Sequence, residues 1–241
     1  MPKAVATKAR EPMDYHVFHG YSQPPFELTP DPGLMVFSKS HEDALDLLYR
    51  GIVSGQGFLS LTGEVGTGKT MILHTLLGLL GDEFLIAYVY NAHLTSSDLI
   101  AVIMLELGVE TAPDASDAAR LSALNSFLIE ARKQNKRPLI MLDEAQNLTP
   151  KTLEEMRVLS NLETPQGKLI QFLLCGQPEL NEQLNKPELR QLKQRIGVRA
   201  RLTPYTLAET TRYIDERSAM AGCERLPFNR EHLVHIHAIS L

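Results

Sequence analysis

Eight consecutive residues, Gly63 to Thr70, read G-E-V-G-T-G-K-T and form a complete Walker A motif. Glycines let the chain turn tightly and bring backbone N–H groups close to phosphate oxygens. Lys69 supplies a positive charge for the β- and γ-phosphates, and the Thr70 hydroxyl is a ligand for Mg²⁺. A helix that starts here would also point its positive dipole end at the anion. The motif therefore predicts a nucleoside triphosphate site made by Gly63, Glu64, Val65, Gly66, Thr67, Gly68, Lys69, Thr70 and Met71.

A pair of acids, Asp143 and Glu144, directly follows the apolar run 139–142. Such a run is typical of a buried strand, and ligands bind at the carboxyl ends of strands in open α/β sheets. We expect Asp143, with Thr70, to hold Mg²⁺ directly or through water. We expect Glu144 to orient and polarise the attacking water as a general base. Together with the loop, the pair predicts nucleotide hydrolysis.

Three further polar residues are candidates for the site. Asn91 ends a predicted strand, where it either hydrogen-bonds Glu144 and holds it away from water or only turns the chain. Gln177 follows the next apolar strand and is predicted to contact the γ-phosphate or the attacking water. Arg195 ends a basic helix just before the last strand, with Arg190 as the second choice. It is either an arginine finger for the site of an adjacent subunit or part of a solvated helix face.

Strand and helix patterns alternate from residue 57 onward, which predicts an α/β fold with a five-stranded, mostly parallel sheet and helices on both faces. The expected strands are 58–62, 84–90, 138–142, 169–174 and 198–202. The expected helices are 69–80, 96–107, 117–134, 150–162 and 187–196. A strand lies between the two motifs, so the acidic strand should not neighbour the first strand. This arrangement indicates the P-loop NTPase branch (ASCE) in which a catalytic glutamate is usual.

The chain divides by composition into three segments. Residues 1–40 are a proline- and aromatic-rich arm, residues 41–203 are the predicted nucleotide-binding core, and residues 204–241 are purely helical. The last segment, with helices at about 206–221 and from 229, is the expected start of a small helical lid. The arm either covers the core or helps to cradle the nucleotide base.

Composition indicates the compartment. The net charge is only −5, which does not indicate a broad electropositive surface, although a local basic strip is compatible with it. The only two cysteines, Cys175 and Cys223, are far apart, as in proteins of a reducing compartment. No secretory signal is visible, and no stretch approaches the roughly 20 apolar residues that span a membrane. We expect a cytoplasmic protein.

Taken together, these motifs resemble those of AAA+ ATPases, and more closely the ExeA (GspA) family of general secretion pathway ATPases. The more specific elements are the P-D-P arm (Pro30 to Pro32), the D-E-A-Q segment (Asp143 to Gln146) and the G-Q-P-E-L segment (Gly176 to Leu180). The resemblance implies ATP and Mg²⁺ as cofactors and hydrolysis coupled to assembly of an envelope secretion complex. It also implies a homo-oligomer and an inner-membrane secretion partner, with a peripheral position at that membrane as an alternative location.

Two departures and one relative qualify this expectation. The arm reads Phe18-His19-Gly20-Tyr21 where the family usually has Phe-Gly-Leu. The family's lid continues into a Gly-x-Pro-Arg segment beyond the last residue here, so we expect an incomplete lid without the sensor-2 arginine. Transposition ATPases of the TniB, TnsC and MuB kind share this core, which leaves a DNA-associated regulator as the alternative function. A local strip of Lys193, Arg195, Arg199 and Arg201 would serve that alternative.

Overall fold

A computed structural model of the chain describes residues 18–26, 35–90, 94–112, 114–164, 167–223 and 226–240. The chain forms two compact units, each described here by itself. The larger unit runs from Lys39 to Pro204. The smaller unit combines the two ends of the chain, up to Ser38 and from Tyr205.

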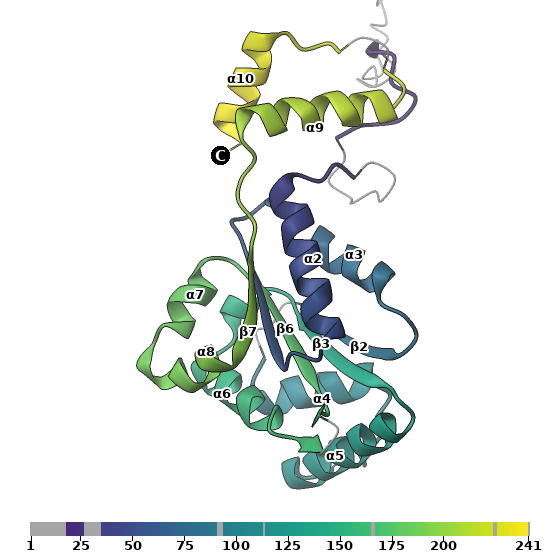
Figure 1. Cartoon of the computed structure of the whole chain (residues 1–241), viewed down its shortest axis with the longest axis vertical. Helices are drawn as coiled ribbons and strands as arrows, with labels where there is room; N and C mark the ends of the chain where they lie inside the picture. The colour runs from purple at the N-terminus through teal and green to yellow at the C-terminus, as the bar shows by residue number, and fades with distance from the viewer. Residues whose placement is uncertain are drawn as a thin grey trace, which may run out of the picture. The chain divides into compact units, whose positions relative to one another are not determined.

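The larger unit is built on a sheet of five parallel strands (Figure 1). The strands are β1 (Phe58–Thr62), β2 (Phe84–Val89), β3 (Arg137–Leu142), β6 (Gln171–Gly176) and β7 (Ile196–Arg201). Their order is β2-β3-β6-β1-β7, so β6 separates the acidic strand β3 from β1. The predicted fold class and strand order are therefore confirmed. The three central strands are buried at nearly every position because helices cover both faces.

Helices pack on the two faces of this sheet (Figure 1). On one face lie α2 (Lys39–Val53) and α3 (Lys69–Leu79); on the other lie α4 (Ser96–Glu106), α5 (Asp117–Lys133), α6 (Pro150–Leu159), α7 (Glu179–Leu184) and α8 (Arg190–Arg195). Alternate strand residues divide between the faces. Phe58 stacks on Phe172 in the core under α4 to α8, with ring centroids 5.0 Å apart. Leu59 faces α2, where the absence of a side chain on Gly51 permits close packing.

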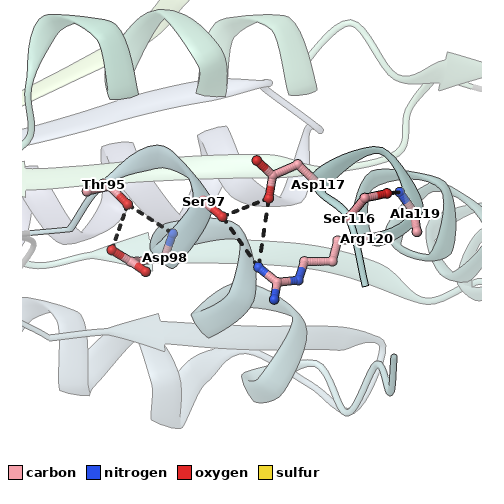
Figure 2. A network of polar contacts seen from close by, with 7 residues as sticks. All are labelled: Thr95, Ser97, Asp98, Ser116, Asp117, Ala119 and Arg120. Carbon is pink, nitrogen blue, oxygen red and sulfur yellow. Dashed lines mark hydrogen bonds and ion pairs between the residues drawn. The ribbon is translucent and has the colours of Figure 1, made fainter. Parts of the chain in front are cut away.

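The N-termini of α4 and α5 are joined by polar side chains (Figure 2). Thr95 caps α4 and Ser116 caps α5 by accepting backbone N–H bonds. Ser97 donates to Asp117 at 2.8 Å, and Arg120 lies 3.8 Å from the same carboxylate. These contacts fix the two helices against each other at one end.

Several short elements differ from the sequence prediction. The predicted helix 187–196 is a 3₁₀ turn, η3 (Pro187–Leu189), followed by α8, and α7 precedes it. Lys186 is extended, with ψ 144°, because a proline disfavours the helical conformation of the residue before it. This extended residue separates α7 from η3. The predicted helix 150–162 ends at Leu159, and a hairpin of β4 (Glu163–Thr164) and β5 (Gly167–Lys168) follows. Strands of two residues are too short to produce a periodic pattern.

The smaller unit contains α9 (Leu207–Met220), α10 (Arg230–Ile239) and the described part of the arm. A capping box of Thr206 and Glu209 starts α9. The described part of the arm packs along this helix: the backbone N–H of Ser22 donates to the Ala221 carbonyl at 2.7 Å, and Arg217 donates to the Pro25 carbonyl at 2.6 Å. The arm and the C-terminal helices thus form one unit although they lie at opposite ends of the sequence.

Among the described residues, no helix is both long enough and apolar enough to cross a membrane.

Candidate nucleotide-binding site

The Walker A residues form the turn between β1 and the N-terminus of α3. Gly68 stands at the helix N-cap with φ 83°, in the left-handed region that glycine adopts without strain. A Cβ at Gly63 would lie 2.6 Å from the Thr67 hydroxyl, so only glycine fits there. The Thr67 hydroxyl in turn donates to the Glu64 carbonyl at 2.7 Å. Backbone sterics and this internal bond therefore set the curled shape of the loop.

Lys69 and Thr70 begin α3 and project into the loop region. The Lys69 ammonium donates to the carbonyls of Gly63 and Glu64, each at 2.9 Å, and the residue is only 7% exposed. Its positive charge is thereby held inside the loop. The Thr70 hydroxyl donates to Asp143 Oδ2 at 3.1 Å, which connects the loop to the end of β3.

Asp143 collects hydrogen bonds at the carboxyl end of β3. It is buried, and its Oδ2 also accepts from the Tyr88 hydroxyl at 3.2 Å. Burial, and then the charge of Asp143, raise the pKa of Tyr88 well above its usual value, so this phenol stays a neutral donor. The same two causes raise the pKa of Cys175, which stays a thiol. The hydroxyl and carboxylate oxygens of Thr70 and Asp143 are the hard donors that suit Mg²⁺.

Glu144 follows Asp143 in a left-handed conformation, with φ 53°, at the start of the 3₁₀ turn η2 (Ala145–Asn147). Two side-chain amides hold its carboxylate. Gln146 donates to Oε2, and Gln177 donates to the same oxygen at 3.3 Å. The Gln177 backbone N–H donates to Gln146 Oε1 at 3.0 Å. These bonds link the ends of β3 and β6 into a unit that we call the glutamate clamp: Glu144, Gln146 and Gln177.

Glycine makes room for the glutamate clamp. A Cβ at Gly176 would lie 2.6 Å from Gln146 Oε1 and 3.3 Å from the Gln146 backbone nitrogen. Any larger residue at Gly176 would push the Gln146 amide away from its partners. The fixed position of Glu144 therefore depends on both strand ends.

Sequence reasoning missed His41, Tyr88 and the role of Gln146. His41 of α2 is buried, and its Nε2 lies 2.9 Å from the Thr67 carbonyl oxygen, so it connects the Walker A loop to α2. It stands 26 positions before Thr67, and no spacing rule connects the two residues. Gln146 was visible as part of the D-E-A-Q segment, but only its contact with Gln177 reveals what its amide does.

Of the predicted site residues, one falls outside the described part of the chain and one lies away from this cluster. Asn91 lies outside the described residues. Arg195 precedes Ile196, which pairs with Phe58 at the start of β1. The length of β1 therefore separates Arg195 from the Walker A loop, a distance of roughly 16 Å at about 3.3 Å per residue. Its guanidinium donates to the Ser160 hydroxyl at 3.1 Å, to the Arg157 carbonyl and to Asn161. In its own subunit, Arg195 therefore caps the C-terminal end of α6.

The parallel sheet, the Walker A turn and the acidic end of a non-adjacent strand define a P-loop NTPase. A family model described as "AAA domain" matches residues 50–184, more than half of the chain, and the chain belongs to that family. It is 41% identical over 226 residues to general secretion pathway protein A of Aeromonas hydrophila. That match covers 94% of this chain but only 41% of the relative's length. The predicted resemblance to this AAA+ group is thus confirmed.

Solved structures give the same fold. Cdc6p from Pyrobaculum aerophilum has a TM-score of 0.66 at 21% identity, covering 88% of this chain and 59% of its own. The Aeropyrum pernix ORC2 protein in its ADPNP–ADP complexes has a TM-score of 0.63 at 20% identity, with 90% and 59% covered. Because these identities are low, the two structural matches establish the shared fold alone.

Proposed function

We propose that this chain is a Mg²⁺-dependent ATPase whose nucleotide cycle drives oligomer rearrangement during assembly of an envelope secretion complex. The observation that carries the chemistry is the convergence of Lys69, Thr70, Asp143 and Glu144 at one edge of the sheet. The 41% identity to general secretion pathway protein A supports the biological setting. By the same likeness, we propose a homo-oligomer in the cytoplasm, at the inner face of the inner membrane, with a membrane secretion protein as partner.

The residues suggest a division of labour during hydrolysis. On ATP binding, Lys69 exchanges the Gly63 and Glu64 carbonyls for the β- and γ-phosphate oxygens. Thr70 and Asp143 would hold Mg²⁺, which supplies charge neutralisation on the phosphates when bound. Glu144 takes a proton from the water whose oxygen attacks the γ-phosphorus. The bond from that phosphorus to the β–γ bridging oxygen breaks, and ADP and phosphate are released.

Two measurements test this function. Purified protein with ATP and Mg²⁺ should release phosphate, and light scattering should detect larger assemblies with a non-hydrolysable ATP analogue than with ADP. An absence of phosphate release at any protein concentration would contradict the ATPase proposal. Release without any nucleotide-dependent change in mass would contradict only the assembly step.

The Gln146→Ala substitution tests the glutamate clamp. It removes one donor to Glu144 and the acceptor for the Gln177 N–H. Because a hydrogen bond to a charged group contributes about 1.5–3 kcal/mol, we expect kcat to fall about tenfold or more with little change in KM for ATP. Steady-state phosphate release measures both constants. Gln134→Ala, at an exposed helix end, is the matched control, and an unchanged kcat in Gln146→Ala would refute the positioning role.

Arg195 remains our candidate for an arginine finger acting across a subunit interface. If it acts in this way, Arg195→Ala protein should be inactive alone but regain activity when mixed with Lys69→Ala protein. The intact site of one subunit would then meet the intact arginine of the other. If Arg195 only caps α6, mixtures should give the simple sum of the separate activities. Thermal unfolding of Arg195→Ala should then show a loss of stability of about 0.3–1 kcal/mol, the contribution of the cap.

One observation favours the second candidate, a DNA-associated ATPase. Arg199 and Arg201 are exposed on β7, an edge strand of the sheet. Fluorescence anisotropy with duplex DNA tests this candidate, because log affinity should fall linearly with log salt concentration. An absence of duplex DNA binding at low salt would exclude the DNA-associated function.

A further inference from the structure

The buried histidine of α2, His41, contacts the Walker A loop at the peptide that joins Thr67 to Gly68. Its Nε2 lies 2.9 Å from the Thr67 carbonyl oxygen. Because a carbonyl oxygen can only accept, Nε2 carries a hydrogen and donates it to this bond. The imidazole also lies against Gly68, where a Cβ would come within 2.9 Å of Nε2. His41 therefore touches both residues of one peptide unit of the loop.

This peptide unit is one that a phosphate group would meet. The Gly68 N–H belongs to the Walker A motif, whose backbone N–H groups cradle the α- and β-phosphates of a nucleotide. The peptide is trans, so its carbonyl and its N–H point in opposite directions. A bond that fixes the Thr67 carbonyl on one side therefore also fixes the direction of the Gly68 N–H on the other.

Helix α2 is a rigid support for this contact. One face of the helix is buried at helical spacing, at His41, Ala44, Leu48 and Ile52. Near the other end of α2, Gly51 approaches the sheet so closely that a Cβ would lie 2.7 Å from the Leu59 side chain. Helix α3, which begins in the loop, lies beside α2 on the same face of the sheet (Figure 1). The sheet thus fixes α2, and the first turn of α2 holds the loop.

The bond from His41 differs from the bonds that Lys69 makes inside the loop. The carbonyls of Gly63 and Glu64 accept from Lys69, which we expect to turn to the phosphates when a nucleotide binds. The imidazole lies on the carbonyl side of the Thr67–Gly68 peptide, opposite to the N–H that would meet the phosphate. A nucleotide therefore does not compete with His41 for its partner, and the bond can persist in the loaded site.

We propose that His41 is a positioning residue of the nucleotide site, which holds the Thr67–Gly68 peptide so that the Gly68 N–H faces the phosphates. This inference rests on the proposed use of the Walker A loop for nucleotide binding, but not on hydrolysis. It assigns to His41 an effect on affinity, because a group that is already oriented does not have to be ordered when the ligand binds. ATP and ADP both carry the α- and β-phosphates, so the binding of both should depend on His41.

Two amide substitutions at His41 test the position of the donor. The amide nitrogen of glutamine lies about as far along the side chain as Nε2, whereas that of asparagine reaches only as far as Nδ1. We expect His41→Gln to bind ATP and ADP within about threefold of wild type. His41→Asn should bind both about tenfold more weakly, because the hydrogen bond to the loop is lost. Equilibrium titrations with fluorescent ATP and ADP analogues measure these affinities.

Stability has to be separated from positioning, since His41 is buried. Thermal unfolding without nucleotide gives the melting temperature of each variant, and the titrations are made well below the lowest of them. His41→Leu removes the donor without burying an unpaired amide, and it should show the same tenfold loss as His41→Asn. His235→Asn, at an exposed position on α10, is the matched control and should bind both nucleotides as wild type does.

Three results would overturn the proposal. Wild-type affinities in folded His41→Asn and His41→Leu protein would show that the contact only stabilises the fold. Equal losses in His41→Gln and His41→Asn would show that the position of the donor does not matter. A loss confined to ATP would place the effect at the γ-phosphate, away from the N–H groups that ADP also uses.

Hydrolysis gives a readout that is separate from affinity. Glu144 lies at the end of β3, outside the loop that His41 contacts, so kcat at saturating ATP should stay within about twofold of wild type while KM rises in His41→Asn. A lower kcat at unchanged ATP affinity would contradict the positioning role. If wild-type protein binds nucleotide but releases no phosphate, the ATPase proposal fails, and the binding titrations still decide the role of His41.

Discussion

Replacing Lys69 with alanine is expected to abolish ATP binding under conditions in which the wild-type protein binds it. The Lys69 ammonium now donates to two loop carbonyls, and these two donors would turn to phosphate oxygens. Each charge-assisted bond contributes about 1.5–3 kcal/mol, so losing two lowers the affinity about 10²-fold or more. Equilibrium binding of a fluorescent ATP analogue measures this effect.

Lys151→Ala is the control for this prediction, because it removes the same charge from an exposed site on α6. Its ATP affinity should equal that of wild type. The carbonyls of Gly63 and Glu64 lose an internal donor in Lys69→Ala, so its folding must be checked. Circular dichroism should show that the variant is folded. Wild-type ATP affinity in folded Lys69→Ala protein would disprove the assignment of the loop.

The Glu144→Gln substitution is expected to separate binding from chemistry. Glutamine keeps the size of the side chain and retains an oxygen that accepts from the Gln146 and Gln177 amides, but it cannot take a proton from water. We expect hydrolysis to fall by about 10²–10⁴-fold, the usual contribution of a general base. ATP affinity should stay within a few-fold of wild type, because Lys69, Thr70 and Asp143 are unchanged.

Single-turnover phosphate release, combined with equilibrium ATP binding, checks this result. Glu182→Gln, which makes the same change at an exposed position on α7, should hydrolyse ATP normally. Normal turnover by Glu144→Gln would rule out Glu144 as the base. Loss of ATP binding in this variant would instead assign Glu144 to nucleotide affinity.

Much of the core was predictable because its signals are local. Near-continuous apolar runs identified the central strands, and the fixed spacing of Gly63, Gly68, Lys69 and Thr70 identified the loop. A strand followed at once by Asp143 and Glu144 placed two acids at the same sheet edge, since parallel strands carry their carboxyl ends together. The short elements α7, β4 and β5 were missed because they contain too few residues for periodicity.

The contacts around these residues were not predictable, because they join positions far apart in the chain. His41 reaches the Thr67 carbonyl from 26 residues away, and Gln177 lies 33 residues beyond Glu144. The cap that Arg195 gives to α6 is of the same kind, and so is the packing of the described part of the arm on α9. No local pattern encodes such pairs, since each depends on how several elements pack.

The sequence by itself determined the class of fold and the residue types of the Walker motifs, because glycine conformation, strand burial and helix periodicity act within a few residues. The tertiary structure decided which side chains hold Glu144 and how the Walker A loop is supported. Those arrangements follow from strand order and helix packing, which bring distant residues within hydrogen-bonding distance.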